Sequence, residues 1–298
     1  MLTWPDEGIF SQGTLETWSQ PESNLVLDFH GDPLNADLVV FSDGNHHMAL
    51  EPSLQAFKER HPQVGEIFYA TTPPGPILNL LQNGRLRIGN FILSVAPHVF
   101  LSPPHVLDKL VSQGHMADHR PFVRNRGSVL LVGKGNPKKI LGAGDLARED
   151  VRLFLSNPVT ETVSYRGYVD TLKALGTRAG SDMAFLETRV STAKIYFGQS
   201  VHHREAPEAV ASGIVDAAMV YYHLALRYKR IFPEDFDLIP LGGTVNVPDP
   251  EPGNVVGFTH AGLIGDGGPW GRRCLDFLFS SPVADIYAQH GLDAMFSA

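Results

Sequence analysis

The sequence predicts an α/β fold of two lobes, with mixed and mostly parallel sheets flanked by helices. Three segments carry this prediction, because each places an apolar strand, a polar loop and a helical pattern in the same order. They are residues 38–61, 67–81 and 151–175. Strands that alternate with helices are typical of α/β domains. At 298 residues, of which 43% are hydrophobic, the chain can bury one large core or two smaller ones.

The elements of the first half follow from the spacing of apolar residues and from glycine breaks. Residues 1–36 show no sustained period of 2 or 3.6, so we expect an N-terminal extension there. Gly84 and Gly114 end two short helices. The expected elements are strands at 38–41, 66–70, 85–94 and 99–101, helices at 48–61, 76–83 and 106–111, and a β-rich run at 122–132. A run of this length can cross between lobes.

In the second half, Gly176 and Gly213 each close a helix. Residues 190–201 have features of both helix and strand, and their assignment stays open. The expected elements are strands at 151–155 and 217–221 and helices at 164–175, 205–212, 270–279 and 283–290. The alternation of strands and helices therefore continues to the C-terminal part of the chain.

The composition argues against several classes of function. A formal net charge of −8 and a pI near 5.9 argue against nucleic-acid binding. Cys274 is the only cysteine, which excludes an intramolecular disulfide and a zinc site built from cysteines. No apolar run approaches the ~18 residues of a membrane-spanning helix, so a soluble protein is expected. Residues 1–7 lack the basic and apolar regions of a signal peptide.

Five segments in order carry a resemblance to the type II solute-binding proteins that serve ABC importers, closest to the molybdate- and tungstate-binding branch. They are residues 38–64, 122–137, 150–176, 211–221 and 275–292. The resemblance implies one lobe from residues 37–120 with 246–298, a second lobe from 121–245, and an extension at 1–36. It also implies a monomer that closes by hinge bending over a small inorganic ion between the lobes.

Delivery of that ion to an ABC transporter permease follows from the same resemblance, with no catalysis, no cofactor and no nucleic acid. The implied location is periplasmic or extracytoplasmic if an export signal has been removed, and otherwise soluble in the cytoplasm. The resemblance places ligand contacts in the loops that follow strands, at Ser42, Asp43, Asn45, Thr71, Thr72, Asn157, Thr160 and Tyr221.

Neutral donors of this kind suit a tetrahedral oxyanion, because hydroxyls and helix N-terminal N–H groups bind anions without a charged partner. The same polar residues could instead be ordinary helix caps. Asp43 departs from the pattern, since a carboxylate within about 5 Å repels an oxyanion unless it is protonated or turned away.

The ferric-ion-binding branch of the same superfamily is an alternative, which would use His46, Tyr221 and Tyr222. Hard oxygen ligands with one imidazole suit trivalent iron. An enzyme on the same fold is a further alternative; one such class needs a cofactor-bearing cysteine in a loop, whereas Cys274 is expected in a helix. His202 lacks the His-Glu-x-x-His spacing of a metal site and is expected at an exposed helix start.

Overall fold

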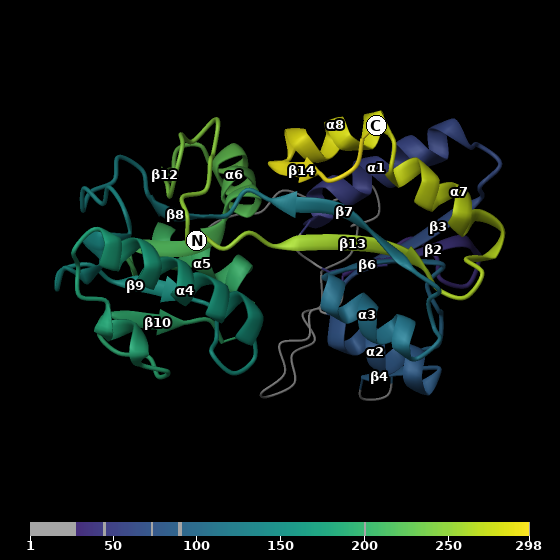
Figure 1. The fold of residues 1–298 in the computed structure, drawn as a ribbon, viewed down its shortest axis with the longest axis horizontal. Helices are drawn as coiled ribbons and strands as arrows, with labels where there is room; N and C mark the ends of the chain where they lie inside the picture. The colour runs from purple at the N-terminus through teal and green to yellow at the C-terminus, as the bar shows by residue number, and fades with distance from the viewer. Residues whose placement is uncertain (1–27, 44–45, 73, 89–90, 200, 298) are drawn as a thin grey trace. The chain divides into compact units, whose positions relative to one another are not determined.

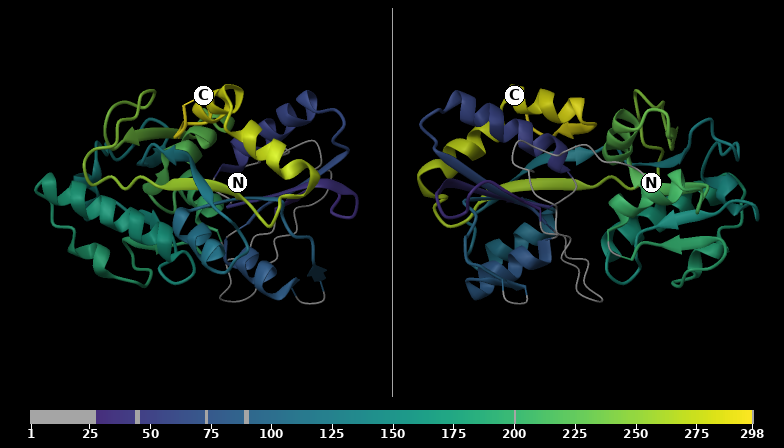
Figure 2. Two further views of the ribbon diagram at one scale, coloured as in Figure 1. Left: turned by 45° about the vertical axis from the view of Figure 1, so that its right-hand side comes forward. Right: turned by 180° about the vertical axis from the view of Figure 1, so that it is seen from behind.

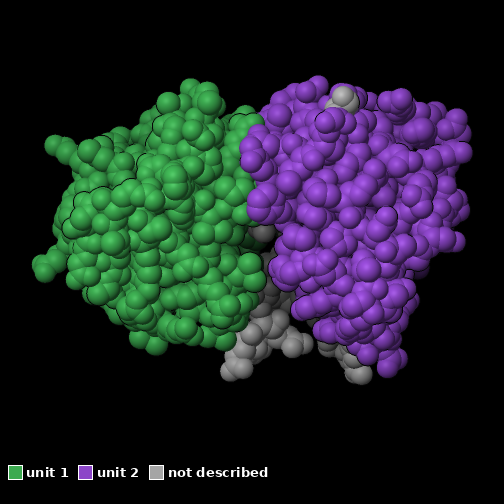
Figure 3. Space-filling view, viewed as in Figure 1, with its two compact units in different colours: residues 1–5, 19–24, 125–257 green, residues 6–18, 25–124, 258–298 purple. Residues whose placement is uncertain are grey.

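The computed structural model describes residues 28–43, 46–72, 74–88, 91–199 and 201–297. These residues form two units, shown in green and purple in Figure 3. Unit 1 is the segment 125–257, and unit 2 contains the described residues of 28–124 together with 258–297. The lobes predicted from the sequence had their boundaries at 120/121 and 245/246. The second crossing lies later because Asn254 bonds to Ser128 and Leu241, both in unit 1.

Unit 2 contains a mixed sheet with the strand order β1-β3-β2-β6-β13-β7-β14. Its central strands β3, β2 and β6 are parallel to one another, whereas β1 and β13 pair antiparallel to their neighbours. The strands are β1 Phe29–His30, β2 Ala36–Ser42, β3 Glu66–Thr71, β6 Val99–Ser102, β7 His119–Asn125, β13 Phe258–Leu263 and β14 Leu292–Ala294. The antiparallel hairpin of β4 Leu86–Ile88 and β5 Phe91–Leu93 lies within the predicted strand region 85–94.

Helices cover both faces of the unit 2 sheet, as Figures 1 and 2 show. Along β2, Leu38 and Val40 join one core cluster with α1, α7 and α8, while Val39 and Phe41 join another with α2 and α3. This alternation is the period of 2 that a strand buried on both faces requires. The helices are α1 His47–Arg60, α2 Pro74–Asn83, α3 Pro104–Ser112, α7 Gly268–Leu278 and α8 Ser281–Gln289.

Unit 1 contains a second mixed sheet with the strand order β10-β9-β11-β8-β12. Strands β10, β9 and β11 are parallel, and β8 runs antiparallel to β11 and β12. Helix α4 packs on one core cluster of this sheet, and α5 and α6 pack against β8 and β11. The elements are β8 Ser128–Gly133, β9 Leu153–Leu155, α4 Thr162–Arg178, β10 Ile195–Phe197, α5 His202–Ala211, β11 Ala217–Tyr221, α6 Tyr222–Ile231 and β12 Phe236–Pro240.

The structure revises one predicted element and assigns a segment that the sequence left open. The expected run at 122–132 is two strands, β7 and β8, because Gly127 has a φ of +72° and breaks the extended backbone. The segment 190–201, left open above, contains the short strand β10, and α5 begins directly after it. None of the helices in these described parts of the chain is both long and apolar enough to span a membrane.

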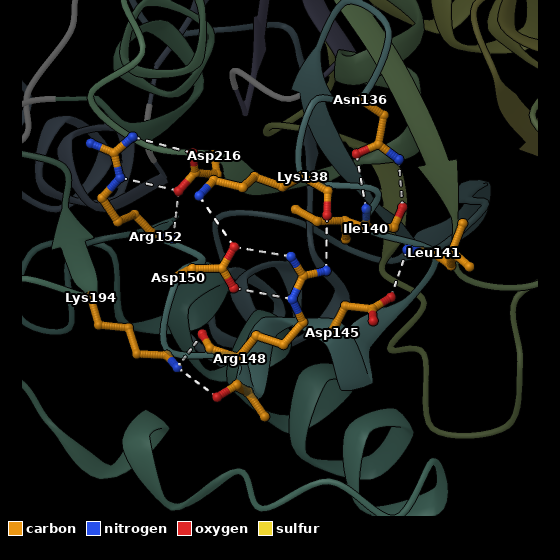
Figure 4. A network of polar contacts seen from close by, with 11 residues as sticks. Asn136, Lys138, Ile140, Leu141, Asp145, Arg148, Asp150, Arg152, Lys194 and Asp216 are labelled. Carbon is orange, nitrogen blue, oxygen red and sulfur yellow. Dashed lines mark hydrogen bonds and ion pairs between the residues drawn. The ribbon is translucent and has the colours of Figure 1, made fainter.

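A polar network stabilises unit 1 at the segments that precede β9 and β10 (Figure 4). Lys194 donates from Nζ to the backbone carbonyls of Ala147 and Arg148, both at 2.8 Å, and its Nζ lies 4.5 Å from the centre of the Phe185 ring. Arg148 in turn pairs with Asp150. Lys194 therefore satisfies two carbonyls at once.

Replacing Lys194 with Met should lower the free energy of unfolding of unit 1 by about 1–3 kcal/mol, because two partly buried carbonyls lose their donor. Urea denaturation followed by tyrosine fluorescence measures this change. The matched control is Lys173→Met, which removes an exposed ion pair with Glu187 and should cost about 1 kcal/mol or less. Equal losses in the two variants would contradict the assigned role of Lys194.

Candidate functional site

Three parallel strands of unit 2 end in hydroxyl residues at one edge of the sheet. Ser42 ends β2, Thr71 ends β3 and Ser102 ends β6. The Cα atoms of Ser42 and Thr71 are register partners, and Ser42 pairs in the same way with Leu101, which precedes Ser102. All three hydroxyl residues are buried, and Ser102 Oγ has no hydrogen-bond partner among the described residues. The carboxyl ends of parallel strands therefore bring these groups together.

His46 lies at the start of α1 in a fully buried network. Its Nε2 is 2.9 Å from Ser42 Oγ, and its Nδ1 is 3.0 Å from the Tyr287 hydroxyl. Because Ser42 Oγ donates to the carbonyl of Asp43, it accepts from His46 Nε2–H, and Tyr287 then donates to Nδ1. Burial lowers the pKa of His46 to about 4, so the ring is neutral near pH 7. Both ring nitrogens of His46 thus have protein partners.

The Thr71 hydroxyl, predicted as a ligand contact, donates to Asp28 Oδ2 at 2.8 Å. Asp28 also pairs with His30 at 3.0 Å, and the His30 ring stacks on Tyr69. Since a threonine hydroxyl has one proton, Thr71 cannot donate to a ligand while it donates to Asp28. Thr72 is fully buried, and its backbone N–H donates to the carbonyl of Ser42.

Acid should destabilise unit 2 through Asp28. Burial alone would raise the pKa of Asp28, but the hydrogen bonds and charge of His30 and the Thr71 hydroxyl outweigh burial and lower the pKa from 3.8 to about 2. A carboxyl whose pKa is lowered on folding stabilises the fold above its unfolded pKa. That stability, about 2 kcal/mol, is then lost as the pH falls from about 4 towards 2.

Chemical denaturation of Asp28→Asn at pH 7, 4 and 2 checks this prediction. The variant should be less stable than the wild type at pH 7, and the difference should shrink steadily on acidification. Thr244→Val, an exposed threonine in unit 1, serves as a control for general acid effects. A difference between Asp28→Asn and wild type that is constant from pH 7 to pH 2 would refute the assigned role of Asp28.

Asp43 is buried directly after β2, at the start of the loop that leads to α1, and its Oδ1 is 3.5 Å from His46 Nε2. Its backbone N–H donates to the carbonyl of Leu101, which ties the loop to β6. Asn45 was also predicted as a contact from this loop, and it lies outside the described residues. The buried carboxylate of Asp43 therefore faces His46, a local partner.

The unit 1 sheet has a corresponding edge. Tyr221 ends β11 and is the register partner of Ser128, which begins the antiparallel strand β8. Ser156 directly follows β9, which is parallel to β11. The hydroxyl oxygens of Ser128, Ser156 and Thr160 are buried, and none of them finds a hydrogen-bond partner in the described part of the chain.

The sequence pattern did not predict Ser102, Ser128 and Ser156 as contacts, because it favoured residues inside polar loops. A simple signal was present, since each serine occupies the first or last position of a buried strand or the position directly after it. Strand ends on the carboxyl edge of a parallel sheet are where ligands of α/β proteins bind.

Asn157, another predicted contact, uses its side chain to shape its own loop. Its Oδ1 accepts from the backbone N–H groups of Val159 at 2.9 Å and Thr160 at 3.1 Å, and its Nδ2 donates to the carbonyl of Gly198 at 2.8 Å. This is the turn geometry that asparagine commonly forms with the residues that follow it. Asn157 therefore positions Thr160 and holds the loop against the segment after β10.

The two tyrosines proposed as iron ligands have different surroundings. The Tyr221 ring packs 5.0 Å from the Tyr168 ring and stacks on His223. Tyr222 is buried, and its hydroxyl donates to the carbonyl of Val245 at 2.9 Å. Within the described ranges, no group of three or more His, Cys, Asp or Glu side chains has an arrangement that could hold a metal ion.

His202 was expected at an exposed helix start, and this expectation is wrong. Only 2% of the residue is exposed, because its ring packs against Phe154 of β9 and Tyr168 of α4. Burial lowers the pKa of His202 to about 3, so the ring is neutral near pH 7. Its Nε2 has no partner among the residues that the structure describes. Cys274 is helical as predicted, and burial raises the pKa of its thiol.

Two mixed α/β units, joined by two chain crossings, form a fold that this chain shares with solved sulfate- and molybdate-binding proteins. The model of the family described as bacterial extracellular solute-binding protein matches residues 38–293, and the chain belongs to this family. No curated protein matches the sequence.

Three solved structures illustrate the likeness in fold. The sulfate-binding protein SubI from Mycobacterium tuberculosis has a TM-score of 0.62 at 15% identity, covering 88% of this chain and 88% of that chain. The periplasmic molybdate-binding protein of Azotobacter vinelandii has a TM-score of 0.53 at 17% identity, covering 88% and 100%. Iron-bound HitA from Pseudomonas aeruginosa has a TM-score of 0.57 at 17% identity, covering 85% and 84%.

These findings confirm the predicted α/β fold class and the resemblance to type II solute-binding proteins. The chain is a solute-binding protein by family, and that family consists of binding proteins, not enzymes. The identities are all below 25%, so the likeness to individual structures concerns the fold.

Proposed function

We propose that this protein captures a small inorganic oxyanion, of the molybdate or tungstate type, for ABC-type uptake. One observation supports this proposal above all others, namely the buried hydroxyls of Ser128 and Ser156 at strand ends of unit 1, which have no partner in the described part of the chain. A tetrahedral oxyanion offers several acceptor oxygens and needs no charged partner when neutral donors surround it.

Energetics favour a ligand as the missing partner of these hydroxyls. Each buried hydroxyl without a hydrogen bond costs about 1–3 kcal/mol. Native proteins contain few such groups, and each one calls for an explanation. Binding of an oxyanion would supply acceptors to these donors and recover the cost.

The hydrogen bonds of His46 and Tyr222, two of the three alternative iron ligands, do not favour iron binding. His46 has both ring nitrogens engaged by Ser42 and Tyr287, and the Tyr222 hydroxyl is engaged by Val245. A metal would have to displace one of the two His46 partners and the hydrogen bond of the Tyr222 hydroxyl before it could use these ligands. Tyr221 remains a candidate contact for either ion.

The remaining parts of the proposal follow from the family. Its members are extracellular, so we place the protein outside the cytoplasm and propose delivery of the ion to a membrane permease. Capture between the two lobes, with hinge closure over the ion, and a monomeric state remain predictions from the sequence resemblance.

Titration calorimetry with molybdate, tungstate, sulfate and chelated ferric iron tests the proposed function. Oxyanion affinity should change by less than about threefold between pH 6 and pH 8, because burial keeps His46 and His202 neutral throughout this range and serine hydroxyls do not titrate. Iron bound through tyrosinate would release protons and weaken steeply on acidification. A coloured iron complex without oxyanion binding would overturn the proposal.

A further inference from the structure

The carboxylate of Glu161 accepts hydrogen bonds from backbone N–H groups of two other segments. Its Oε2 accepts from the N–H of Asn157 and its Oε1 from the N–H of His202, both at 3.2 Å. Glu161 holds the position before the first turn of α4, yet no side-chain bond caps its own helix. The carboxylate instead bridges the loop after β9 and the first residue of α5.

These two N–H groups are donors of the kind that bind anions. The N–H of His202 lies in the first turn of the ten-residue helix α5, so it has no partner within that helix, and the helix dipole there favours negative charge. The N–H of Asn157 follows the last residue of a parallel strand by two positions. A carboxylate on both donors occupies the position that an anionic ligand would take.

Two buried polar side-chain atoms of the same or a neighbouring residue have no hydrogen-bond partner within the described residues. Ser156 Oγ belongs to the residue directly before Asn157, and His202 Nε2 belongs to the same residue as the second donor. Both residues are at least nine-tenths buried. The segments that carry these groups lie side by side, because the centre of the His202 ring is 5.6 Å from that of Phe154, two residues before Ser156, and a Cβ added at Gly198 would lie 3.4 Å from the His202 Cα.

We propose that Glu161 is an internal competitor of the oxyanion, which holds the N–H groups of Asn157 and His202 until the ligand displaces it. This inference rests on the proposed function, because it concerns the same ligand. On binding, oxygen atoms of the anion accept from the two N–H groups and from Ser156, and the carboxylate swings away. A ligand must therefore carry enough negative charge and enough acceptor atoms to replace the Glu161 carboxylate at both N–H groups.

Two variants separate competition from simple charge repulsion. Glu161→Asp keeps the charge, but its side chain is one methylene shorter and cannot reach both N–H groups. Glu161→Gln removes the charge and keeps the length. Competition predicts that both variants bind molybdate about tenfold more tightly than the wild type, whereas repulsion alone predicts a gain for Glu161→Gln only. Glu187→Gln, an exposed glutamate paired with Lys173 in the same unit, is the matched control and should leave the affinity unchanged.

Calorimetry with molybdate and with sulfate measures these affinities, and urea denaturation verifies that each variant is folded. A second measurement needs no variant, because the backbone amide signals of Asn157 and His202 in ¹H–¹⁵N spectra of the wild type should shift on saturation with molybdate. Wild-type binding with unmoved amide signals, or variants that bind no tighter, would overturn the role of Glu161 alone. Absence of oxyanion binding in the wild type and in all variants would instead overturn the proposed function.

Discussion

Replacing Ser156 with alanine should weaken molybdate binding about tenfold or more while leaving the ligand-free protein as stable as the wild type or more stable. The two effects differ in sign because the hydroxyl of Ser156 is fully buried and has no partner in the described structure. Removing a buried hydroxyl that lacks a hydrogen bond relieves its desolvation cost, whereas the bound anion loses a donor. Ser128→Ala should behave in the same way.

The opposed changes distinguish a ligand contact from an ordinary buried serine, whose loss would lower stability and leave the affinity alone. Calorimetry gives the affinity, and urea denaturation without ligand gives the free energy of unfolding. Ser212→Ala is the matched control, since Ser212 is exposed at the end of α5 and bonds only within its own helix. Unchanged molybdate affinity in both Ser128→Ala and Ser156→Ala would show that these hydroxyls do not contact the ligand, and it would contradict the main argument for the proposed function.

The sequence was sufficient to predict the fold class, because the fold class depends on local patterns of apolar and polar residues. The alternation along β2 and the helical spacing in α1 are visible in any short window of the chain, and each period dictates which face is buried. The strand and helix order then limits the topology to a few arrangements. The break between β7 and β8 could not be predicted from local patterns, because it lies at Gly127, which packs against the remote residue Asn254.

The candidate site was harder to predict, because the partner of a polar side chain is often far away in sequence. Thr71 was chosen for its place in a polar loop, but its hydroxyl bonds to Asp28, and this partner cannot be inferred from neighbouring residues. Asn157 is a polar residue in a loop and was therefore predicted as a ligand contact, but its side chain bonds to the backbone of the turn that follows it. His202 looked exposed beside polar neighbours, and Tyr168 of a different helix buries it.

Asn254 shows how one remote side chain determines the position of Ser128, a proposed ligand contact. Its Oδ1 accepts from the N–H of Ser128 at 2.8 Å, and its Nδ2 donates to the carbonyls of Ser128 and Leu241, both at 3.0 Å. Asn254 is 7% exposed, so water does not readily replace these bonds. Asn254 thus holds Ser128, the first residue of β8, in place, although the two residues are 126 positions apart in the chain.

Asn254→Ala should therefore lower the free energy of unfolding of unit 1 by about 3 kcal/mol or more, because one N–H and two carbonyls lose their partner in a buried place. Molybdate affinity should fall as well, since Ser128 is no longer held at the edge of the sheet. Urea denaturation measures the first effect, and hydrogen exchange of the Ser128 amide, expected to accelerate at least tenfold, localises it. Asn83→Ala, which removes an exposed asparagine bonded within its own helix, is the matched control and should cost under about 0.5 kcal/mol. Slow exchange of the Ser128 amide in Asn254→Ala would show that other contacts hold β8, and the affinity loss predicted for this variant would then have no structural basis.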